Sequence, residues 1–366
     1  MNSIRKEVSI PHEIIFEIFS WLPAKSLMRF KCVSGFCNSL VSRSDFTDIH
    51  RCRSRTRPGG TKFFLHEDRA FYTAEQKEDG KDFAALLQIV SFDEIYPAYS
   101  RLDCVNGLFC IWVPASVEPA AIFNPSTREV RFLPNLNKDI CWRTKFFCQE
   151  NYSLGFESGE KKYKVLLSTK HAQYRKNWVL TLGIDESWRE TQSISPDIVH
   201  IMPGICINGV IYQFVYWSTN ANTPAIAGFD IKSEKFNIIA LWNASYHMVV
   251  DYKLIEVKGK LAVTNCENLL SGYIHLWILE IEDQWKSYII RTIWNGIYSR
   301  IRSHLQITSL CKSRNGDILF IVNLKSGTLC LCYDVTRQSW SKLEITGLPK
   351  ESFIKGIGSY VERLVM

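Results

Sequence analysis

Residues 10–34 have the sequence IPHEIIFEIFSWLPAKSLMRFKCVS, in which apolar residues recur at the spacing of a helix face. Ile14, Ile18 and Leu22 follow one another at intervals of four, which predicts one amphipathic helix. Pro11 can open that helix, and Pro23 can end it and start a second one. After Ser34, a suitable N-cap, the apolar spacing continues in residues 36–41. The sequence therefore predicts three short helices at the N-terminal end.

The size of this helical head limits what it can do alone. A unit of fewer than about 40 residues buries too little surface to be stable without disulfides, a metal or a partner. Here the apolar stripe is wider than three short helices can cover among themselves. The surplus must pack on the rest of the chain, as a plain helical cap, or on another protein.

The same residues resemble a known motif. The pattern Ile10-Pro11-x-x-Ile14-x-x-x-Ile18-x-x-x-Leu22-Pro23 is followed by Leu27, Phe30, Cys32-Val33-Ser34, Leu40 and Phe46. It resembles the F-box, and closely its plant form. The sequence departs from the family at Cys37, where the family usually has a tryptophan, although Phe36 lies beside it.

The resemblance implies a partner for the surplus apolar surface. F-box helices dock on the acidic Skp-type adaptor of a cullin–RING ubiquitin ligase and tether a substrate-binding domain to it. The residues that would bind the adaptor are Ile10, Pro11, Ile14, Ile18, Leu22, Pro23, Leu27, Phe30, Val33 and Leu40. A basic docking face would suit such a partner.

From about residue 61 the apolar pattern changes from helical to alternating, and one unit repeats. Each unit has an apolar strand, a polar turn and a second strand that starts on a large residue, as in AIFNPSTREVRF, residues 121–132. The large residues are separated by 58, 48, 49 and 55 positions, and they are Val130, Trp188, Phe236, Trp285 and Trp340. A second marker, a turn ending in glycine, has nearly the same period and occurs at Asn106-Gly107, Asn208-Gly209, Lys258-Gly259 and Asn315-Gly316.

A period of about 50 residues with several strands per unit indicates the blades of a β-propeller. Residues 61–366 would hold about six blades of kelch-like length. We therefore predict a mainly β protein with a small α head: an F-box over residues 1–50, a linker over 51–60 and a propeller over 61–366. The propeller region resembles the plant F-box-associated domain, through residues 123–128, Gly155-Phe156, Tyr163-Lys164-Val165 and 359–365. It is also similar to the pollen S-locus F-box proteins, which recognise S-ribonucleases.

The positive charge of the chain belongs to one end. Residues 1–60 hold ten of the 44 Lys and Arg but only five of the 37 Asp and Glu, so most of the net charge of +7 lies there. Four arginines alternate along residues 51–57, which predicts a solvated linker, with an acidic partner or a nucleic acid as alternatives. The nearly neutral body and the lack of a nucleic-acid-binding motif argue against nucleic acid.

Neither catalytic nor metal-binding motifs stand out. The chain has no P-loop, no H-E-x-x-H and no G-x-S-x-G, and the twelve cysteines form no C-x-x-C pair. We therefore expect no cofactor, no metal, no membrane segment and no catalytic residue. We also expect reduced thiols in a cytoplasmic or nuclear protein.

The leading hypothesis is a non-catalytic substrate receptor that binds the adaptor through the head and an unidentified target protein through the propeller. Target contacts are expected in loops of one propeller face, around Trp142, around Tyr174 and Arg175, and in residues 218–223 and 267–272. The alternative is a propeller enzyme or a sugar-binding lectin with a helical cap, which would need convergent polar groups in the central channel.

Overall fold

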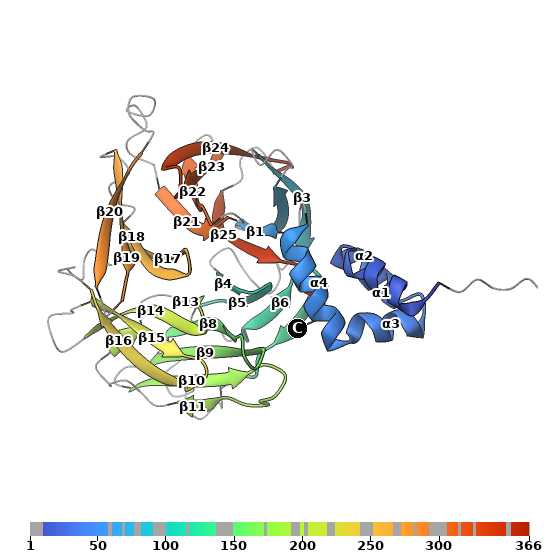
Figure 1. Ribbon diagram of the computed structural model, residues 1–366. Helices are drawn as coiled ribbons and strands as arrows, with labels where there is room; N and C mark the ends of the chain where they lie inside the picture. Colours follow the sequence, from blue (N-terminus) through green and yellow to red (C-terminus); the bar gives the residue numbers. More distant parts are fainter. Residues whose placement is uncertain are drawn as a thin grey trace, which may run out of the picture.

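A computed structural model places a small helical head against a large β-propeller (Figure 1). The residues it describes are 10–57, 61–67, 70–76, 82–90, 100–114, 116, 118–136, 149–171, 174–191, 198–200, 204–217, 224–241, 252–265, 272–281, 284–292, 306–313, 316–324, 327–348 and 353–365. Among the described residues no helix is both long enough and apolar enough to cross a membrane.

The head contains four helices rather than the three expected from the sequence. They are α1 (His12–Ser20), α2 (Ala24–Lys31), α3 (Gly35–Ser42) and α4 (Ser44–Thr56). The prediction of a linker over residues 51–60 was wrong for its first six residues, which form the second half of α4. The alternating arginines are stable in a helix because their guanidinium groups contact both the other helices and the propeller, as described below.

The propeller has six blades of antiparallel strands arranged around a centre, with the first strand of each blade innermost (Figure 1). The first two complete blades are β4 (Arg101–Val105), β5 (Leu108–Trp112), β6 (Ala121–Asn124) and β7 (Glu129–Phe132), then β8 (Gln149–Glu157), β9 (Lys162–His171), β10 (Tyr174–Thr181) and β11 (Arg189–Thr191). The third has five strands, β12 (Ile198–His200), β13 (Ile205–Ile207), β14 (Val210–Trp217), β15 (Pro224–Asp230) and β16 (Lys235–Ala240).

The remaining blades complete the ring. The fourth is β17 (Tyr252–Val257), β18 (Lys260–Asn265), β19 (Tyr273–Leu279) and β20 (Trp285–Arg291). The fifth is β21 (Gln306–Lys312), β22 (Ile318–Leu324), β23 (Gly327–Asp334) and β24 (Ser339–Thr346). The sixth combines the two ends of the propeller chain, β25 (Ile354–Val361) with β1 (Thr61–Glu67), β2 (Phe71–Gln76) and β3 (Asp82–Val90).

The sixth blade closes the ring. Strand β25 pairs antiparallel with β1, from Thr61 opposite Val361 to Glu67 opposite Ile354. The outer strands β24 and β3 also pair, in parallel, which joins the fifth and sixth blades into one sheet. Because the first and last strands pair, the two ends of the propeller chain are held together in one blade.

The glycine turns predicted from the sequence connect the first two strands of a blade. Asn106 and Asn208 have φ of 55° and 50°, and the glycine after each also has positive φ. Two consecutive residues with positive φ form the tight turn that suits a hairpin. Gly316 has the same conformation, whereas Asn315 lies outside the described residues.

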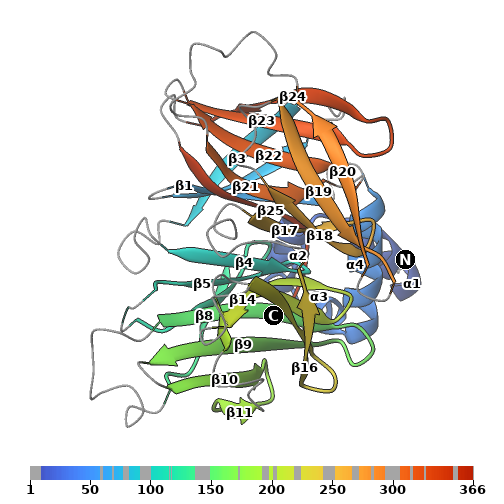
Figure 2. The same ribbon diagram turned by 90° about the vertical axis from the view of Figure 1, so that its left-hand side faces the viewer.

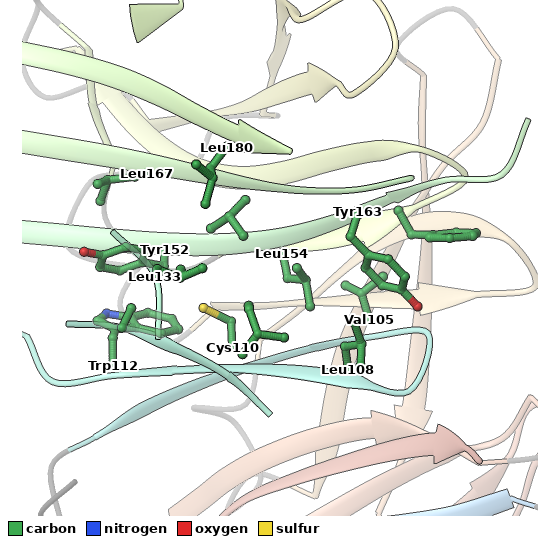
Figure 3. Close-up of a cluster of buried hydrophobic side chains, with 14 of the residues drawn as sticks. Val105, Leu108, Cys110, Trp112, Leu133, Tyr152, Leu154, Tyr163, Leu167 and Leu180 are labelled. Atoms are coloured by element: carbon green, nitrogen blue, oxygen red, sulfur yellow. The ribbon is translucent and has the colours of Figure 1, made fainter. Parts of the chain in front are cut away.

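The large residues of the repeat lie at or next to the start of the outermost strand in five blades, and the three tryptophans among them bond to the preceding blade. The indole Nε1 of Trp188 donates to the Pro134 carbonyl of the preceding blade over 2.6 Å. Trp285 donates in the same way to Ala240, and Trp340 to Arg291, over 2.9 and 2.7 Å. Between the first two complete blades, buried side chains including Trp112, Tyr152 and Leu167 form one apolar cluster (Figure 3).

Candidate functional site

The two prolines of the head fix where its helices begin. Pro11 is the N-cap of α1, with the helix starting at His12, and its carbonyl accepts from the N–H groups of Ile14 and Ile15. Pro23 is likewise the N-cap residue of α2. Ser34 caps α3 as predicted, because its Oγ accepts from the Cys37 N–H over 3.1 Å.

One side of the head faces inward. Leu27 and Leu40 are 0% and 5% exposed and pack with Phe46 and with Leu364 from the end of the propeller chain. Leu22 is half-buried against the same cluster. Leu27 and Leu40, predicted from the resemblance to touch the adaptor, therefore form the core of the head and have no surface to offer a partner in this structure. Their apolar character gave no information about which way they point.

The other side of the head is an exposed apolar surface. Five of the predicted residues are between 38% and 72% exposed, namely Ile10, Ile14, Ile18, Phe30 and Val33, and Pro11 and Pro23 are exposed as well. Phe36 and Trp21, which were not in the predicted set, are also exposed. We call Ile10, Ile14, Ile18, Phe30, Val33 and Phe36 the apolar face.

Ring contacts hold the parts of the apolar face together. The rings of Phe19 and Phe30 lie 4.9 Å apart and join α1 to α2. The rings of His12 and Phe36 lie 4.6 Å apart and join α1 to α3. An aromatic side chain is thus presented one position before Cys37, where the family usually has tryptophan.

A buried carboxylate joins the head to the propeller. Glu362, directly after β25, has a side chain only 3% exposed and forms ion pairs with Arg57 and with Lys62, the latter over 2.7 Å. Burial alone would raise the pKa of Glu362, but Lys62, Arg57 and the Ala24 N–H together hold it below its usual value. Arg57 also donates to the carbonyls of Trp21 and Leu22.

Helix α4 uses two faces to connect the head with the propeller. Phe46 and His50 face the other helices, and His50 Nε2 lies 2.9 Å from the Leu22 carbonyl. On the opposite face, Arg51 donates to Asn106 Oδ1 over 2.8 Å, and Asp48 pairs with Lys161 over 2.5 Å. Figures 1 and 2 show the four helices on one side of the propeller, beside β25. These contacts fix the direction of the apolar face relative to the blades.

The centre of the propeller holds a cavity of about 1050 Å³. Its described lining includes one histidine, His66, and three carboxylates, Asp48, Asp103 and Glu256. Nowhere in the described residues do three or more His, Cys, Asp or Glu side chains come together as metal ligands. The described lining therefore shows no metal-ligand cluster, but it does carry charged and polar side chains.

Burial shifts the pKa of several acidic groups that line the cavity. Both carboxylate oxygens of Asp103 accept backbone N–H groups, from Cys104 and Leu154, over 2.7 Å. Burial raises the pKa of Asp103 to about 7. Burial also raises the pKa of the Cys206 thiol to about 11 and that of Cys311 well above its usual value, which keeps both protonated at neutral pH.

The loops predicted to contact a target fall largely outside the described residues. Trp142, residues 218–223 and residues 267–271 are not among them, and Tyr174 and Arg175 form the start of β10. The nine cysteines that the structure describes are all free thiols.

Comparisons with known proteins identify the two parts. Residues 8–49 match the F-box domain family, and residues 62–364 match the F-box associated beta propeller domain family. The chain therefore belongs to the plant F-box proteins with an F-box associated β-propeller.

Individual relatives agree with this assignment. F-box protein At5g65850 of Arabidopsis thaliana is 33% identical over 80% of this chain and 74% of its own length. Putative F-box protein At1g47730 of the same species is 27% identical over 94% of this chain and 87% of its own length. Among solved structures, the crystal structure of the Nidogen/Laminin complex aligns with a TM-score of 0.50 at 8% identity, over 83% of this chain and 100% of that one, which concerns the fold alone.

Proposed function

We propose that this protein is the substrate-recognition subunit of an SCF-type ubiquitin ligase. The observation that carries the proposal is the apolar face of the head, which remains exposed after the head has packed on the propeller. An F-box family domain with such a face supports docking on a Skp-type adaptor, and through it on a cullin–RING ligase.

The chemistry of the apolar face suits a helical protein partner. Ile14 and Ile18 lie four residues apart on α1, with Ile10 just before the helix. Phe30 of α2, Val33 of the following turn and Phe36 of α3 are exposed as well. Burying a large apolar side chain contributes roughly 1.5–3 kcal/mol, and since these are about half covered already, each would add about 1 kcal/mol. We propose that Phe36 supplies the aromatic contact that Cys37 cannot make.

The charge around this face supports an acidic partner. Lys25 and Arg29 project from the exposed side of α2, and within the part of the chain that the structure describes neither forms an ion pair. Positive side chains beside an apolar surface raise the association rate with an acidic partner, and here they lie on α2, whereas α1 carries the exposed Glu13 and Glu17.

The propeller is proposed to hold the target on the side away from the head. Helix α4 contacts the turns at Asn106 and Lys161, which connect the inner strands of two blades. The opposite ends of these strands are free of the head. In this role the chain carries out no chemistry itself, because ubiquitin transfer follows from the raised local concentration of the target.

A reconstituted ligase tests the proposal. Targets are captured on the full-length chain from plant cells treated with a proteasome inhibitor, then incubated with adaptor, cullin, RING protein and ubiquitin. Unmodified protein should transfer ubiquitin to the captured target. The double variant Ile14→Glu/Ile18→Glu should capture the same target but transfer none. Equal transfer by both proteins would show that the head does not recruit the ligase.

The similarity to S-locus F-box proteins makes S-ribonucleases the first targets to examine, by binding assays with a panel of allelic forms. We propose a cytoplasmic or nuclear location, where free thiols such as Cys32 and Cys52 remain reduced. Fluorescent tagging of the full-length chain would check that location.

A further inference from the structure

One face of α4 lines the propeller cavity, and it carries two arginines and one aspartate. Asp48, Arg51 and Arg55 occur at intervals of three and four, so they lie on the same side of the helix. They line the cavity together with Asn106 and Lys161 from the turns of two blades. This end of the cavity is therefore built jointly by the head and the propeller, a usual place for ligand sites.

The described lining of the cavity carries more positive than negative charge. It includes seven Lys or Arg side chains and three Asp or Glu side chains. Two of the carboxylates are already paired, Asp48 with Lys161 and Glu256 with Lys312, each over 2.5 Å. The third, Asp103, accepts two backbone N–H groups.

Arg51 and Arg55 have no carboxylate partner among the described residues. Both donate to the same neutral atom, Asn106 Oδ1, over 2.8 and 3.4 Å, which brings the two guanidinium groups close together. Arg51 is also held over the Phe156 ring, with 5.2 Å between its Cζ and the ring centroid. Two like charges are thus fixed side by side, with their remaining N–H donors available for an anion.

The surroundings make the charge of Arg51 costly in the free protein. Burial lowers the pKa of Arg51, and the nearby guanidinium groups of Arg55 and Arg363 lower it further. An anion placed between Arg51 and Arg55 would relieve the repulsion and accept charge-assisted hydrogen bonds from both.

We propose that the head-facing end of the propeller cavity binds a small, multiply charged anion carrying phosphate groups, held by Arg51 and Arg55. The cavity volume of about 1050 Å³ is close to that of the larger small-molecule sites, so it has room for a small polyanion. The bound anion would also link α4 to the blade turn at Asn106. It would therefore stabilise the junction between head and propeller. The proposal is independent of adaptor docking, because the apolar face lies on the other helices.

Calorimetric titration of the full-length chain with inorganic triphosphate at low ionic strength tests the site. We expect wild-type binding to weaken about tenfold in Arg51→Gln/Arg55→Gln, since charge-assisted hydrogen bonds are lost. The matched control, Arg131→Gln/Arg337→Gln, removes the same charge from exposed positions outside the cavity and should bind within about twofold of wild type. Arg55→Gln alone, whose contact to Asn106 is long, provides a variant that keeps the fold, and it should bind about threefold more weakly than wild type.

Three results would overturn the proposal. The first is no binding of triphosphate by wild-type protein at millimolar concentration. The second is equal weakening in the cavity variant and the control, which would indicate general charge attraction. The third is preferential binding of an acidic peptide of the same net charge that displaces triphosphate, which would assign the site to a protein segment.

Discussion

The backbone N–H of Ala24 donates to Glu362 Oε2 over 3.0 Å, although the two residues are 338 positions apart. Ala24 begins α2, and the residue before it, Pro23, has no side chain that can cap a helix. The carboxylate that satisfies this first-turn N–H comes instead from the residue after the last propeller strand. The segment that closes the propeller thus also completes the head, and this contact joins the two parts.

Removing the charge of Glu362 should destabilise this junction strongly. In Glu362→Gln, Arg57 keeps its positive charge in a buried site without a carboxylate partner among the described residues, and Lys62 keeps only Glu75. We expect a loss of about 3–5 kcal/mol in the free energy of unfolding, measured by chemical denaturation. Glu344→Gln, at an exposed position of β24, is the control and should change stability by less than about 0.5 kcal/mol. A similar small change in both variants would show that the ion pairs do not stabilise the fold.

The buried carboxyl of Asp103 should make stability depend on pH near neutrality. Its pKa is about 7 in the folded protein and about 3.9 in an unfolded chain, so folding binds a proton between these values. The contribution of Asp103 is therefore complete below pH 4 and is lost as the pH rises through 7. The slope should reach about 1.4 kcal/mol per pH unit and be absent in Asp103→Asn. Identical pH profiles for the two proteins would contradict a raised pKa.

Each tryptophan contact between blades should contribute measurably to the free energy of unfolding. Trp340→Phe keeps an aromatic ring but removes the N–H that binds the Arg291 carbonyl. We expect a loss of about 0.5–1.5 kcal/mol in the free energy of unfolding. Tyr288→Phe removes a polar atom from a half-exposed ring and should change stability by less than about 0.5 kcal/mol. If Trp340→Phe also changed stability by less than about 0.5 kcal/mol, the hydrogen bond to Arg291 would not stabilise the packing of the two blades.

The repeat of the propeller could be predicted because its markers are set by local chemistry. The turn at Asn106-Gly107 requires positive φ at both residues, and asparagine and glycine supply it at least cost. Trp285 and Trp340 start the outer strands because an indole can fill the gap between blades and still donate to a carbonyl. Both features leave a periodic trace in the sequence.

The direction of the head's side chains could not be predicted in the same way. Leu27 and Ile14 are equally apolar, yet Leu27 is buried because it faces Phe46 and Leu364, and Ile14 is exposed. Leu364 comes from the far end of the chain, so no local pattern indicates this contact. Arg51 and Arg57 were predicted to lie in a solvated linker for the same reason. Their partners Asn106 and Glu362 are remote in sequence. The helical spacing of Phe46, His50 and Ser54, all buried, was the available clue to α4.

The distinction between core and surface predicts different consequences for two substitutions in the head. Leu27→Asp buries a charge in the core of the head and should unfold α1–α4, seen as lost amide protection by hydrogen exchange, while the propeller stays protected. Val33→Asp, at a position 72% exposed, should leave the amide protection of the head unchanged. Retained protection in Leu27→Asp would contradict the packing described above.

Affinity for a plant Skp-type adaptor, measured by calorimetry on the full-length chain, tests the central claim most directly. Wild-type protein should bind at micromolar concentration or below, and Ile14→Glu/Ile18→Glu should weaken binding about a hundredfold, because two charges replace apolar contacts. Ile184→Glu/Ile281→Glu makes the same change at exposed positions of the propeller and should bind like wild type. No adaptor binding by wild-type protein, or equal binding by both double variants, would contradict docking through the apolar face.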